Sequence, residues 1–295
     1  MKITLTGSLG NISKPLAQTL INKGHEVTII SSNANRAAEI EALGATPAIG
    51  SIDDVDFLTS AFSTADAVYT MVPPSFTTTN YRTYIAGIGS KYAEAIKKSG
   101  VKKIVNLSSI GADLPAGTGP IAGLHDVENI YKNLDGVAIK HLRPAYFFIN
   151  FFGNIDMIKH ANILGSNYSA DTKLVLVHPN DIAEAAAEEL QQNFTGTSVR
   201  YIASNDEVTA GDVASTLGKA VGKAELPWIE FTNEQALEGM VQAGLSEEIA
   251  KNYVEMGDAI RNKVLFEDYY KNRPAALGKT KLEDFASEFA LVYNS

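Results

Sequence analysis

The chain of 295 residues contains no cysteine and a single tryptophan. Without cysteine it can form neither disulfide bonds nor thiolate metal sites, and it has no thiol nucleophile. It also has no apolar run long enough to cross a bilayer. Its first residues, KITLTGSLG, lack the apolar stretch and the cleavage site of a secretion signal. We therefore expect a soluble protein of the cytoplasm.

Positive charge is also scarce, since 25 Lys and Arg stand against 34 Asp and Glu and leave a net charge of -9. An acidic protein repels polyanions, so we expect direct binding neither to nucleic acid nor to an anionic membrane. The composition is otherwise that of a globular protein, with 45% hydrophobic and 20% charged residues. A chain of this length exceeds what one core usually holds, which favours a large domain and a smaller lobe.

The first half of the sequence alternates short apolar, β-branched runs with longer helical patterns. Strands that alternate with helices of this length form βαβ units. We therefore predict an α/β protein of the Rossmann type, with a doubly wound parallel sheet and helices on both faces. The runs that we expect to be strands are 2–7, 25–30, 45–50, 67–72, 103–108, 137–143 and 198–204.

Beyond about residue 150 the alternation weakens and helical patterns prevail. Amphipathic periodicity predicts helices over 181–192 and 209–222, and over 235–262 it predicts two helices that meet near Gly244. We expect residues 1–150 to form a nucleotide-binding domain, with residues from about 175 to 205 returning to it. Residues 151–295 would form a smaller, mainly helical substrate lobe that is interleaved with it.

A glycine-rich turn, GSLGNIS at residues 7–13, follows the first predicted strand and opens the first predicted helix. Two glycines in this context permit a tight turn and let the backbone approach a pyrophosphate, which the free N–H groups of the helix face. Ser13 replaces the usual third glycine, and we expect it to loosen the packing of helix on strand slightly. The alternative is a plain strand-to-helix loop. The expected contacts to a dinucleotide are Gly7, Ser8, Leu9, Gly10, Asn11 and Ile12.

The end of the second predicted strand bears on the choice between NAD and NADP. NAD sites usually place a carboxylate there to bind the ribose hydroxyls. This chain has Ser31, Ser32 and Asn33, followed by Arg36, and no carboxylate. Hydroxyl, amide and guanidinium groups suit a 2′-phosphate, so we predict NADP(H) as the preferred cofactor. NAD(H) remains the alternative, because Arg36 could equally be a solvated residue of the following helix.

Several segments together carry a resemblance to a known family. They are the turn 7–13, AVYTMVPPS (67–75), NLSSIGA (106–112), GLHDVE (123–128), LRPAYFFINFF (142–152), HPNDIAEAAAEEL (178–190) and KTKLEDFASEF (279–289). In order and spacing the chain resembles the NmrA-like, atypical branch of the short-chain dehydrogenases/reductases. The resemblance implies a Rossmann domain that binds NAD(P)(H), a small C-terminal lobe and a substrate cleft between them. Members include NADPH-dependent quinone, isoflavone and dye reductases, and also redox-sensing regulators without turnover.

The resemblance also implies which strand ends contact the cofactor. Many NADP-using relatives carry an Arg where this chain has Ser32, which leaves a 2′-phosphate to Arg36 and its polar neighbours. Ordinary strand-end packing is the alternative, above all for Val72 and Pro144. The implied contacts are Met71, Val72 and Pro73 after the fourth strand, Ser108 after the fifth, and Pro144, Ala145 and Tyr146 after the sixth.

A catalytic group is harder to find. Typical short-chain dehydrogenases use a Tyr followed four residues later by a Lys, but here Tyr131 is followed by Asp135. His125 is the candidate substitute, because an imidazole exchanges protons near neutral pH and Glu128 stands one helical turn later. The alternative is a helix residue that bonds to Glu128 or touches the ribose. The other histidines have no carboxylate cluster nearby in the sequence, so we expect no metal site.

Hydride transfer to a quinone needs little acid catalysis, so orientation of the two rings is enough for turnover. The aromatic stretch 146–152 could wall an apolar cleft, although we expect at least half of it to pack in the core. We therefore predict an NAD(P)H-dependent reductase of a small molecule such as a quinone. The alternative is a non-catalytic regulator that senses NADP(H) and acts through a partner protein. A sugar-nucleotide epimerase would need the missing Tyr/Lys pair, and the sequence leaves open whether the chain forms a homodimer.

Overall fold

The computed structural model describes all 295 residues of the chain. Its main sheet has seven parallel strands in the order β10-β6-β5-β4-β1-β2-β3. Each strand coincides with a predicted run, so the predicted Rossmann-type fold is confirmed. The strands are β1 (Lys2–Leu5), β2 (Glu26–Ser31), β3 (Thr46–Ile49), β4 (Ala67–Thr70), β5 (Lys103–Leu107), β6 (Ala138–Pro144) and β10 (Thr197–Ile202).

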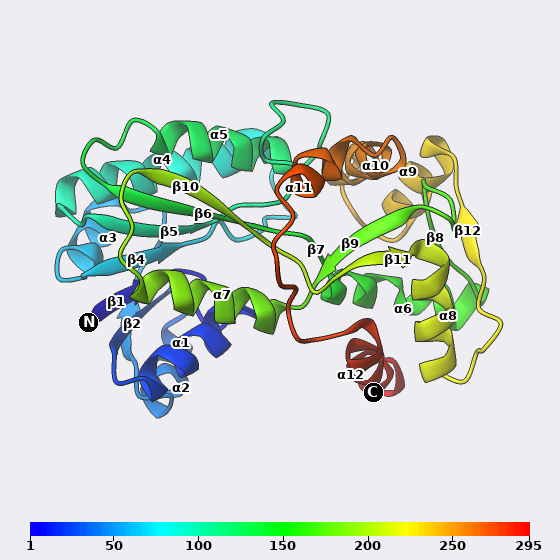
Figure 1. Cartoon of the computed structure of the whole chain (residues 1–295), viewed down its shortest axis with the longest axis horizontal. Coiled ribbons are helices and arrows are strands. Elements are labelled where there is room, and N and C mark those ends of the chain that lie inside the picture. The colour runs from blue at the N-terminus through cyan, green and yellow to red at the C-terminus, as the bar shows by residue number, and fades with distance from the viewer.

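Helices cover both faces of this sheet (Figure 1). One face carries α1 (Ser13–Asn22), η1 (Ala34–Arg36), α2 (Ala37–Ala42) and α7 (Pro179–Gln191), and the other carries α3 (Val55–Phe62), α4 (Tyr81–Ser99) and α5 (Ile121–Tyr131). Alternate side chains of a strand therefore enter different cores: Tyr69 packs in the core that contains α1 and α7, and Val68 in the core that contains α3 and α4. None of the helices has the combination of length and apolar character that crossing a membrane requires.

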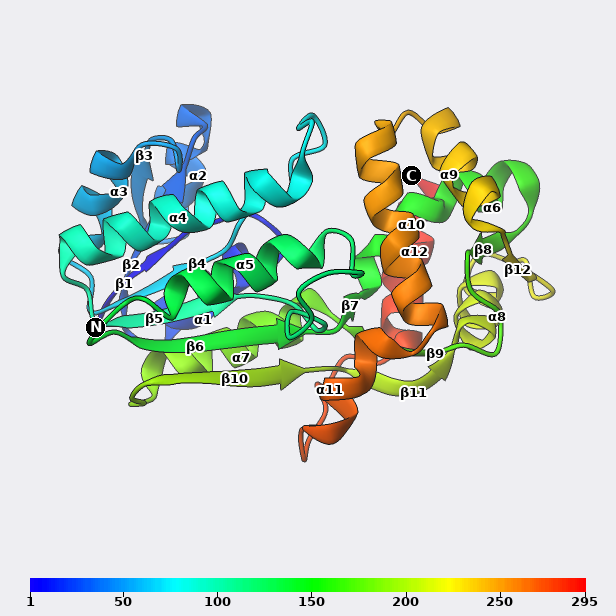
Figure 2. The same cartoon turned by 90° about the horizontal axis from the view of Figure 1, so that it is seen from above.

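The remaining elements lie beyond the carboxyl ends of the main strands (Figure 2). Their helices are η2 (Phe148–Asn154), α6 (Ile155–Ala161), α8 (Ala210–Ala220), α9 (Asn233–Gln242), α10 (Glu247–Arg261), η3 (Val264–Phe266), α11 (Glu267–Lys271) and α12 (Leu282–Asn294). Five short strands accompany them, in sheets of order β11-β9-β7 and β12-β8. They are β7 (Tyr146–Phe147), β8 (Leu164–Ser166), β9 (Lys173–Val177), β11 (Asn205–Thr209) and β12 (Trp228–Glu230).

This part is mainly helical, as predicted, but its short strands were not predicted. Strands of two or three residues such as β7 and β8 are too short to show an alternating pattern. The continuous apolar run of β9 cannot be told from a buried helical segment by periodicity. The predicted break between two helices is present, because α9 and α10 are separated by Gly244, whose φ is +96°.

Two of the segments that carried the family resemblance fasten the C-terminal segment to the main sheet. Asp181, at the start of α7, accepts hydrogen bonds from the backbone N–H of Lys279 at 3.1 Å and of Thr280 at 3.2 Å. Ser204, just after β10, donates to the same carboxylate at 2.5 Å. The 178–190 and 279–289 segments are therefore structural partners, and through them α12 is tied to the sheet.

Candidate functional site

The glycine-rich turn lies at the carboxyl edge of the sheet, where β1 has β4 on one side and β2 on the other. This is the point at which the strand order reverses, and in such sheets ligands bind there. Gly7 adopts φ +88° and the next residue, Ser8, adopts φ +54°. A Cβ on Gly7 would lie 2.5 Å from the Ser13 Oγ and 2.9 Å from the Met71 Cγ. Only glycine fits at this position.

The turn leaves backbone donors free at the start of α1. The N–H groups of Asn11, Ile12 and Ser13 have no acceptor within the chain, and no side chain caps the helix. Gly10 adds no side chain in front of them, and a Cβ there would lie only 3.0 Å from the Gly7 carbonyl oxygen. Unpaired N–H groups at a helix start attract an anion. The turn therefore fits the pyrophosphate of a dinucleotide.

Ser13 does not loosen the helix, contrary to the expectation from the sequence. Its side chain is buried, and its Oγ donates to the carbonyl oxygen of Thr6 at 2.8 Å. The hydroxyl thus joins α1 to the end of β1 with a hydrogen bond that a glycine could not form.

Some of the polar residues at the end of β2 face the glycine turn, and others do not. Arg36 donates from Nη1 to the Ser8 Oγ at 3.0 Å, and Ser8 donates to the Ser31 Oγ at 2.9 Å. Asn33 instead uses its side-chain oxygen to cap η1 by accepting from Asn35 N at 3.0 Å. Ser32 is exposed and its side chain makes no hydrogen bond within the chain. A guanidinium and two hydroxyls are therefore gathered beside the glycine turn.

The segment after β4 is held by its main chain. The Met71 N–H donates to the Thr6 Oγ1 at 2.8 Å, and the Met71 carbonyl accepts from the Tyr92 hydroxyl at 2.9 Å. The Pro73 carbonyl accepts from the Tyr84 hydroxyl at 3.0 Å. Val72 packs against the core of α3 and α4. The segment thus presents a fixed backbone to the carboxyl edge.

A buried ion pair lies behind the ends of β5 and β6. Arg143 donates to both carboxylate oxygens of Glu128, from Nε at 3.0 Å and from Nη2 at 2.8 Å. Burial alone would raise the pKa of Glu128, but the Arg143 guanidinium, together with His141 and the Ser108 hydroxyl, more than offsets this and the pKa is lowered. Ser108 donates its hydroxyl proton to the ionised Glu128 at 2.6 Å. Ser108 can therefore offer a ligand only its lone pairs.

His125 is not paired with Glu128, so that part of the sequence-based hypothesis was wrong. Its Nδ1 lies 2.8 Å from the Ala112 carbonyl oxygen. A carbonyl only accepts, which assigns the proton to Nδ1 and leaves Nε2 for another partner. Tyr131, the last residue of α5, is fully buried and donates its hydroxyl to the Thr70 Oγ1 at 3.2 Å. No cluster of three or more His, Asp or Glu side chains suited to a metal ion is present.

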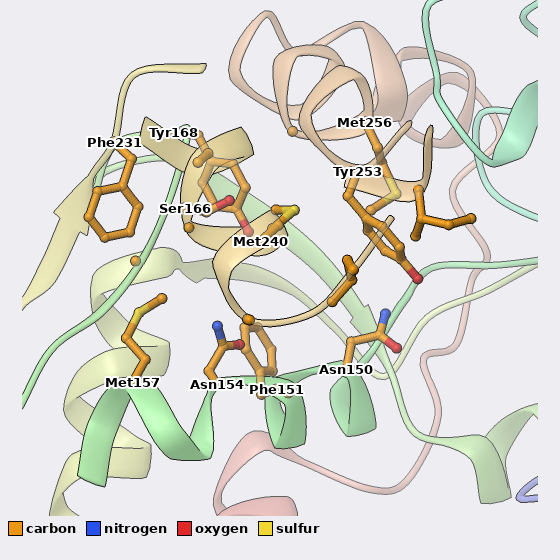
Figure 3. Close-up of a pocket in the computed structure, with 18 of the residues that line it drawn as sticks. Asn150, Phe151, Asn154, Met157, Ser166, Tyr168, Phe231, Met240, Tyr253 and Met256 are labelled. Carbon is orange, nitrogen blue, oxygen red and sulfur yellow. The ribbon is translucent and has the colours of Figure 1, made fainter. Parts of the chain in front are cut away.

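A cavity of about 800 Å³ opens beyond the carboxyl edge, between η2, α9 and α10 (Figure 3). No Asp, Glu, Lys, Arg or His lines it. Two of its lining residues follow strands of the main sheet. Tyr146 comes shortly after β6, and Phe76 lies in the segment after β4. The cavity therefore adjoins the carboxyl edge of the sheet, where we expect the cofactor, and this edge is called the predicted cofactor edge below. Its other walls include Asn150, Phe151, Asn154, Met157, Ser166, Tyr168, Trp228, Phe231, Met240, Tyr253 and Met256.

The polar groups of the cavity are neutral. Burial raises the pKa of Tyr146, and the neighbouring hydroxyls of Tyr168 and Tyr253 raise it further. Burial also raises the pKa of Tyr253 and brings that of Tyr168 to about 12. The Tyr253 hydroxyl from α10 and the Asn150 carboxamide from η2 point toward one another in Figure 3. These phenols stay protonated at neutral pH and serve as hydrogen-bond donors.

The aromatic stretch 146–152 is shared between the cavity and the core. Tyr146 and Phe151 line the cavity. Phe148 stacks on Phe285 of α12 with ring centroids 5.2 Å apart, and Phe152 stacks on Phe289 at 5.9 Å. The stretch 146–152 is thereby packed against α12. The residues just before α12 are in turn hydrogen-bonded to Asp181 of α7.

Sequence analysis missed most of the cavity, because its residues come from distant segments between Phe76 and Ile260. One signal was available in the composition. Three of the five methionines and the single tryptophan line this cavity. A concentration of these residues in one half of a chain indicates a flexible apolar surface.

The NmrA-like family model matches residues 1–286 of the chain. A curated relative, the NAD(P)H azoreductase of Xenophilus azovorans, is 23% identical over 252 residues, which cover 84% of this chain and 83% of that protein. The family match thus spans both the glycine turn and the residues around the cavity.

Solved structures share the whole fold. The NADPH-dependent quinone oxidoreductase of Escherichia coli, complexed with NADPH, has a TM-score of 0.82 and 20% identity, covering 97% of this chain and 99% of its own. The triphenylmethane reductase of Citrobacter sp., complexed with NADP(H), has a TM-score of 0.81 and 21% identity, covering 98% and 99%. At these identities the likeness concerns the arrangement of the chain rather than its chemistry.

Proposed function

The chain belongs to the NmrA-like family, and on that premise we propose that it is an NAD(P)H-dependent reductase of a small, flat electrophile such as a quinone. One observation carries the proposal. A glycine turn with free backbone donors lies at the same edge of the sheet as Tyr146, and Tyr146 lines an uncharged aromatic cavity. A dinucleotide site and an apolar acceptor site thus adjoin each other. Relatives named as a quinone oxidoreductase and an azoreductase support this reading.

The proposed cofactor is NADP(H), with NAD(H) as the weaker alternative. The Arg36–Ser8–Ser31 chain supports the choice, because it offers a guanidinium and two hydroxyls where a 2′-phosphate needs donors. When bound, the cofactor supplies a hydride from its nicotinamide. The residues proposed to contact it are Gly7, Ser8, Leu9, Gly10, Asn11, Ile12, Ser31, Ser32, Asn33, Arg36, Met71, Val72, Pro73, Ser108, Pro144 and Tyr146.

The residues of the chain orient the two reactants in an apolar site and supply no acid. The acceptor gains a hydride and one proton, so NADPH, a proton and a quinone give NADP⁺ and a hydroquinone. Neutral phenols at Tyr146 and Tyr253 can donate hydrogen bonds to the oxygen on which negative charge develops. No carboxylic acid or imidazole lines the cavity, so the proton comes from water, with His125 as the proposed relay outside the cavity.

The alternative, a regulator that binds NADP(H) without turnover, would need no second ligand site. The cavity of about 800 Å³ beside the cofactor edge favours an enzyme, because pockets of this size and character bind small molecules. A sugar-nucleotide substrate is disfavoured, since no cation lines the cavity to meet its diphosphate.

The test is consumption of NADPH by the purified protein with a panel of quinones and azo dyes. Turnover that saturates with both substrates is expected. Binding of NADPH in calorimetry without turnover of any acceptor would support the regulator instead.

The proposal also covers the partners, the location and the assembly state of the protein. The net charge of -9 supports a small-molecule substrate and no nucleic-acid partner. We propose the cytoplasm as its location, which cell fractionation tests. Light scattering gives the assembly state, since a homodimer would have twice the chain mass of 31.6 kDa.

A further inference from the structure

The cavity is larger than a quinone ring requires. A cavity of about 150 Å³ holds benzene, whereas this one measures about 800 Å³. A ring of one or two fused cycles would leave most of the space to water. Water against apolar walls is unfavourable, and each methylene group that replaces it contributes about 0.8 kcal/mol. The unused volume therefore favours a larger apolar ligand.

The two ends of the cavity differ in character (Figure 3). Asn150 and Tyr253 lie at the end nearer the main sheet and present polar groups. Phe231 and Met157 lie at the opposite end, and Met240 lies between the two ends. Asn154 and Ser166 add a carboxamide and a hydroxyl on the far side, but the phenol and carboxamide that point toward one another, and so can hold a carbonyl together, lie at the near end.

The walls beyond the polar end are adaptable. Met157, Met240 and Met256 supply unbranched side chains, which fit irregular and flexible ligands. Gly153 and Gly239 also line the cavity, and a Cβ at either one would meet nothing within 4 Å. Such walls suit a chain that bends more than they suit one rigid plate.

We propose that the substrate is a neutral quinone-type acceptor with a flexible apolar tail, whose ring binds at Asn150 and Tyr253 and whose tail occupies the cavity toward Met240, Met157 and Phe231. This inference rests on the proposed reductase function and names the substrate class of the same site. The tail takes no part in the reaction and supplies binding energy alone.

Binding is measured without turnover by quenching of tryptophan fluorescence. Trp228 is the only tryptophan, lines the cavity and stacks on Tyr168 with ring centroids 5.3 Å apart. The ligands are 2-alkyl-1,4-dimethoxynaphthalenes with tails from methyl to octyl, which cannot accept a hydride. Affinity should rise by about fourfold for each added methylene until the cavity is full.

A variant then tests where the tail lies. Met240→Gln replaces a wall side chain by a polar one of similar shape and helix propensity. It should weaken the octyl ligand by about tenfold and leave the methyl ligand unchanged. Val241→Gln is the matched control, because Val241 is the next residue of α9, is 42% exposed and does not line the cavity.

The same tail series, as 2-alkyl-1,4-naphthoquinones with NADPH, separates this inference from the proposed function. A kcat/KM that rises with tail length supports both. Reduction of every quinone at the same kcat/KM, with equal affinity of the inert methyl and octyl ligands, would overturn the tail site while the reductase stands. Tail-dependent fluorescence quenching without reduction of any quinone would retain the apolar site and reject the reductase.

Discussion

The carboxyl edge of the main sheet and the cavity beyond it are built by different means. At the edge, backbone N–H groups, hydroxyls and the buried Arg143–Glu128 pair make a polar, charged region. The cavity contains no charged side chain and only neutral polar groups. The first region suits a polyanionic ligand and the second a neutral apolar one. Tyr146 directly follows β6 at the carboxyl edge and also lines the cavity, so the two regions adjoin each other there.

If the edge depends on charge, removing the buried cation should have the largest effect of any change considered. Arg143→Met leaves Glu128 buried without its partner and also removes the cation 3.3 Å from Asp268. Breaking a buried ion pair from one side costs about 3–5 kcal/mol. We expect the free energy of unfolding to fall by that amount, as measured by urea denaturation at neutral pH.

The double variant Arg143→Met, Glu128→Gln is the control, and it should recover part of the loss because no buried charge is left unpaired. The wild type should also lose stability in acid. The pKa of Glu128 is lowered in the folded state, so its contribution is present at neutral pH and is lost as pH falls through that lowered value. Equal stability of the single and double variants at all pH values would contradict this account.

The independence of the two regions can be tested at Gly10. Gly10→Val places a branched side chain where the backbone must approach a pyrophosphate, next to the Gly7 carbonyl. Affinity for NADPH in calorimetry should fall by about 100-fold or more, since contacts worth about 3 kcal/mol are blocked. Quenching of Trp228 by an apolar ligand should be unchanged, which shows that the fold persists. Retained NADPH affinity would remove the cofactor assignment.

Within the polar region, Arg36 tests whether the site distinguishes NADPH from NADH. Arg36→Ala removes the guanidinium that donates to Ser8. Hydrogen bonds to charged groups contribute about 1.5–3 kcal/mol, so NADPH should bind about 10- to 100-fold more weakly while NADH binds as before. Arg36→Lys keeps the charge without the planar fork and should lie between the two. Equal losses for both cofactors would favour NAD(H) as the natural ligand.

The two regions also differ in how far the sequence predicts them. The glycine turn is contiguous, and residue types at fixed spacing are enough to propose Gly7 and Gly10 as its cofactor contacts. The cavity is assembled from segments far apart, and an amphipathic pattern such as that of α10 cannot distinguish a residue that faces a core from Tyr253, which faces a cavity. Pairing of titratable groups is equally hidden, because Glu128 and Arg143 lie on different elements.

The smallest effect is expected at His125, which would stand between the two regions if it relays a proton. Its Nδ1 is fixed on the Ala112 carbonyl, and it does not line the cavity. The relay would therefore act through water, so His125→Ala should lower kcat by about three- to tenfold, well below the 10²–10⁴-fold of a direct acid or base. His125→Asn can still donate to Ala112 but cannot exchange a proton.

A fall in kcat in both His125 variants, with an unchanged KM for NADPH, supports the relay. A fall in kcat in the alanine variant alone identifies a structural contact with Ala112 instead. An unchanged kcat in both variants would mean that water reaches the substrate without His125, and that the chain contributes to the reaction only by orienting the two reactants.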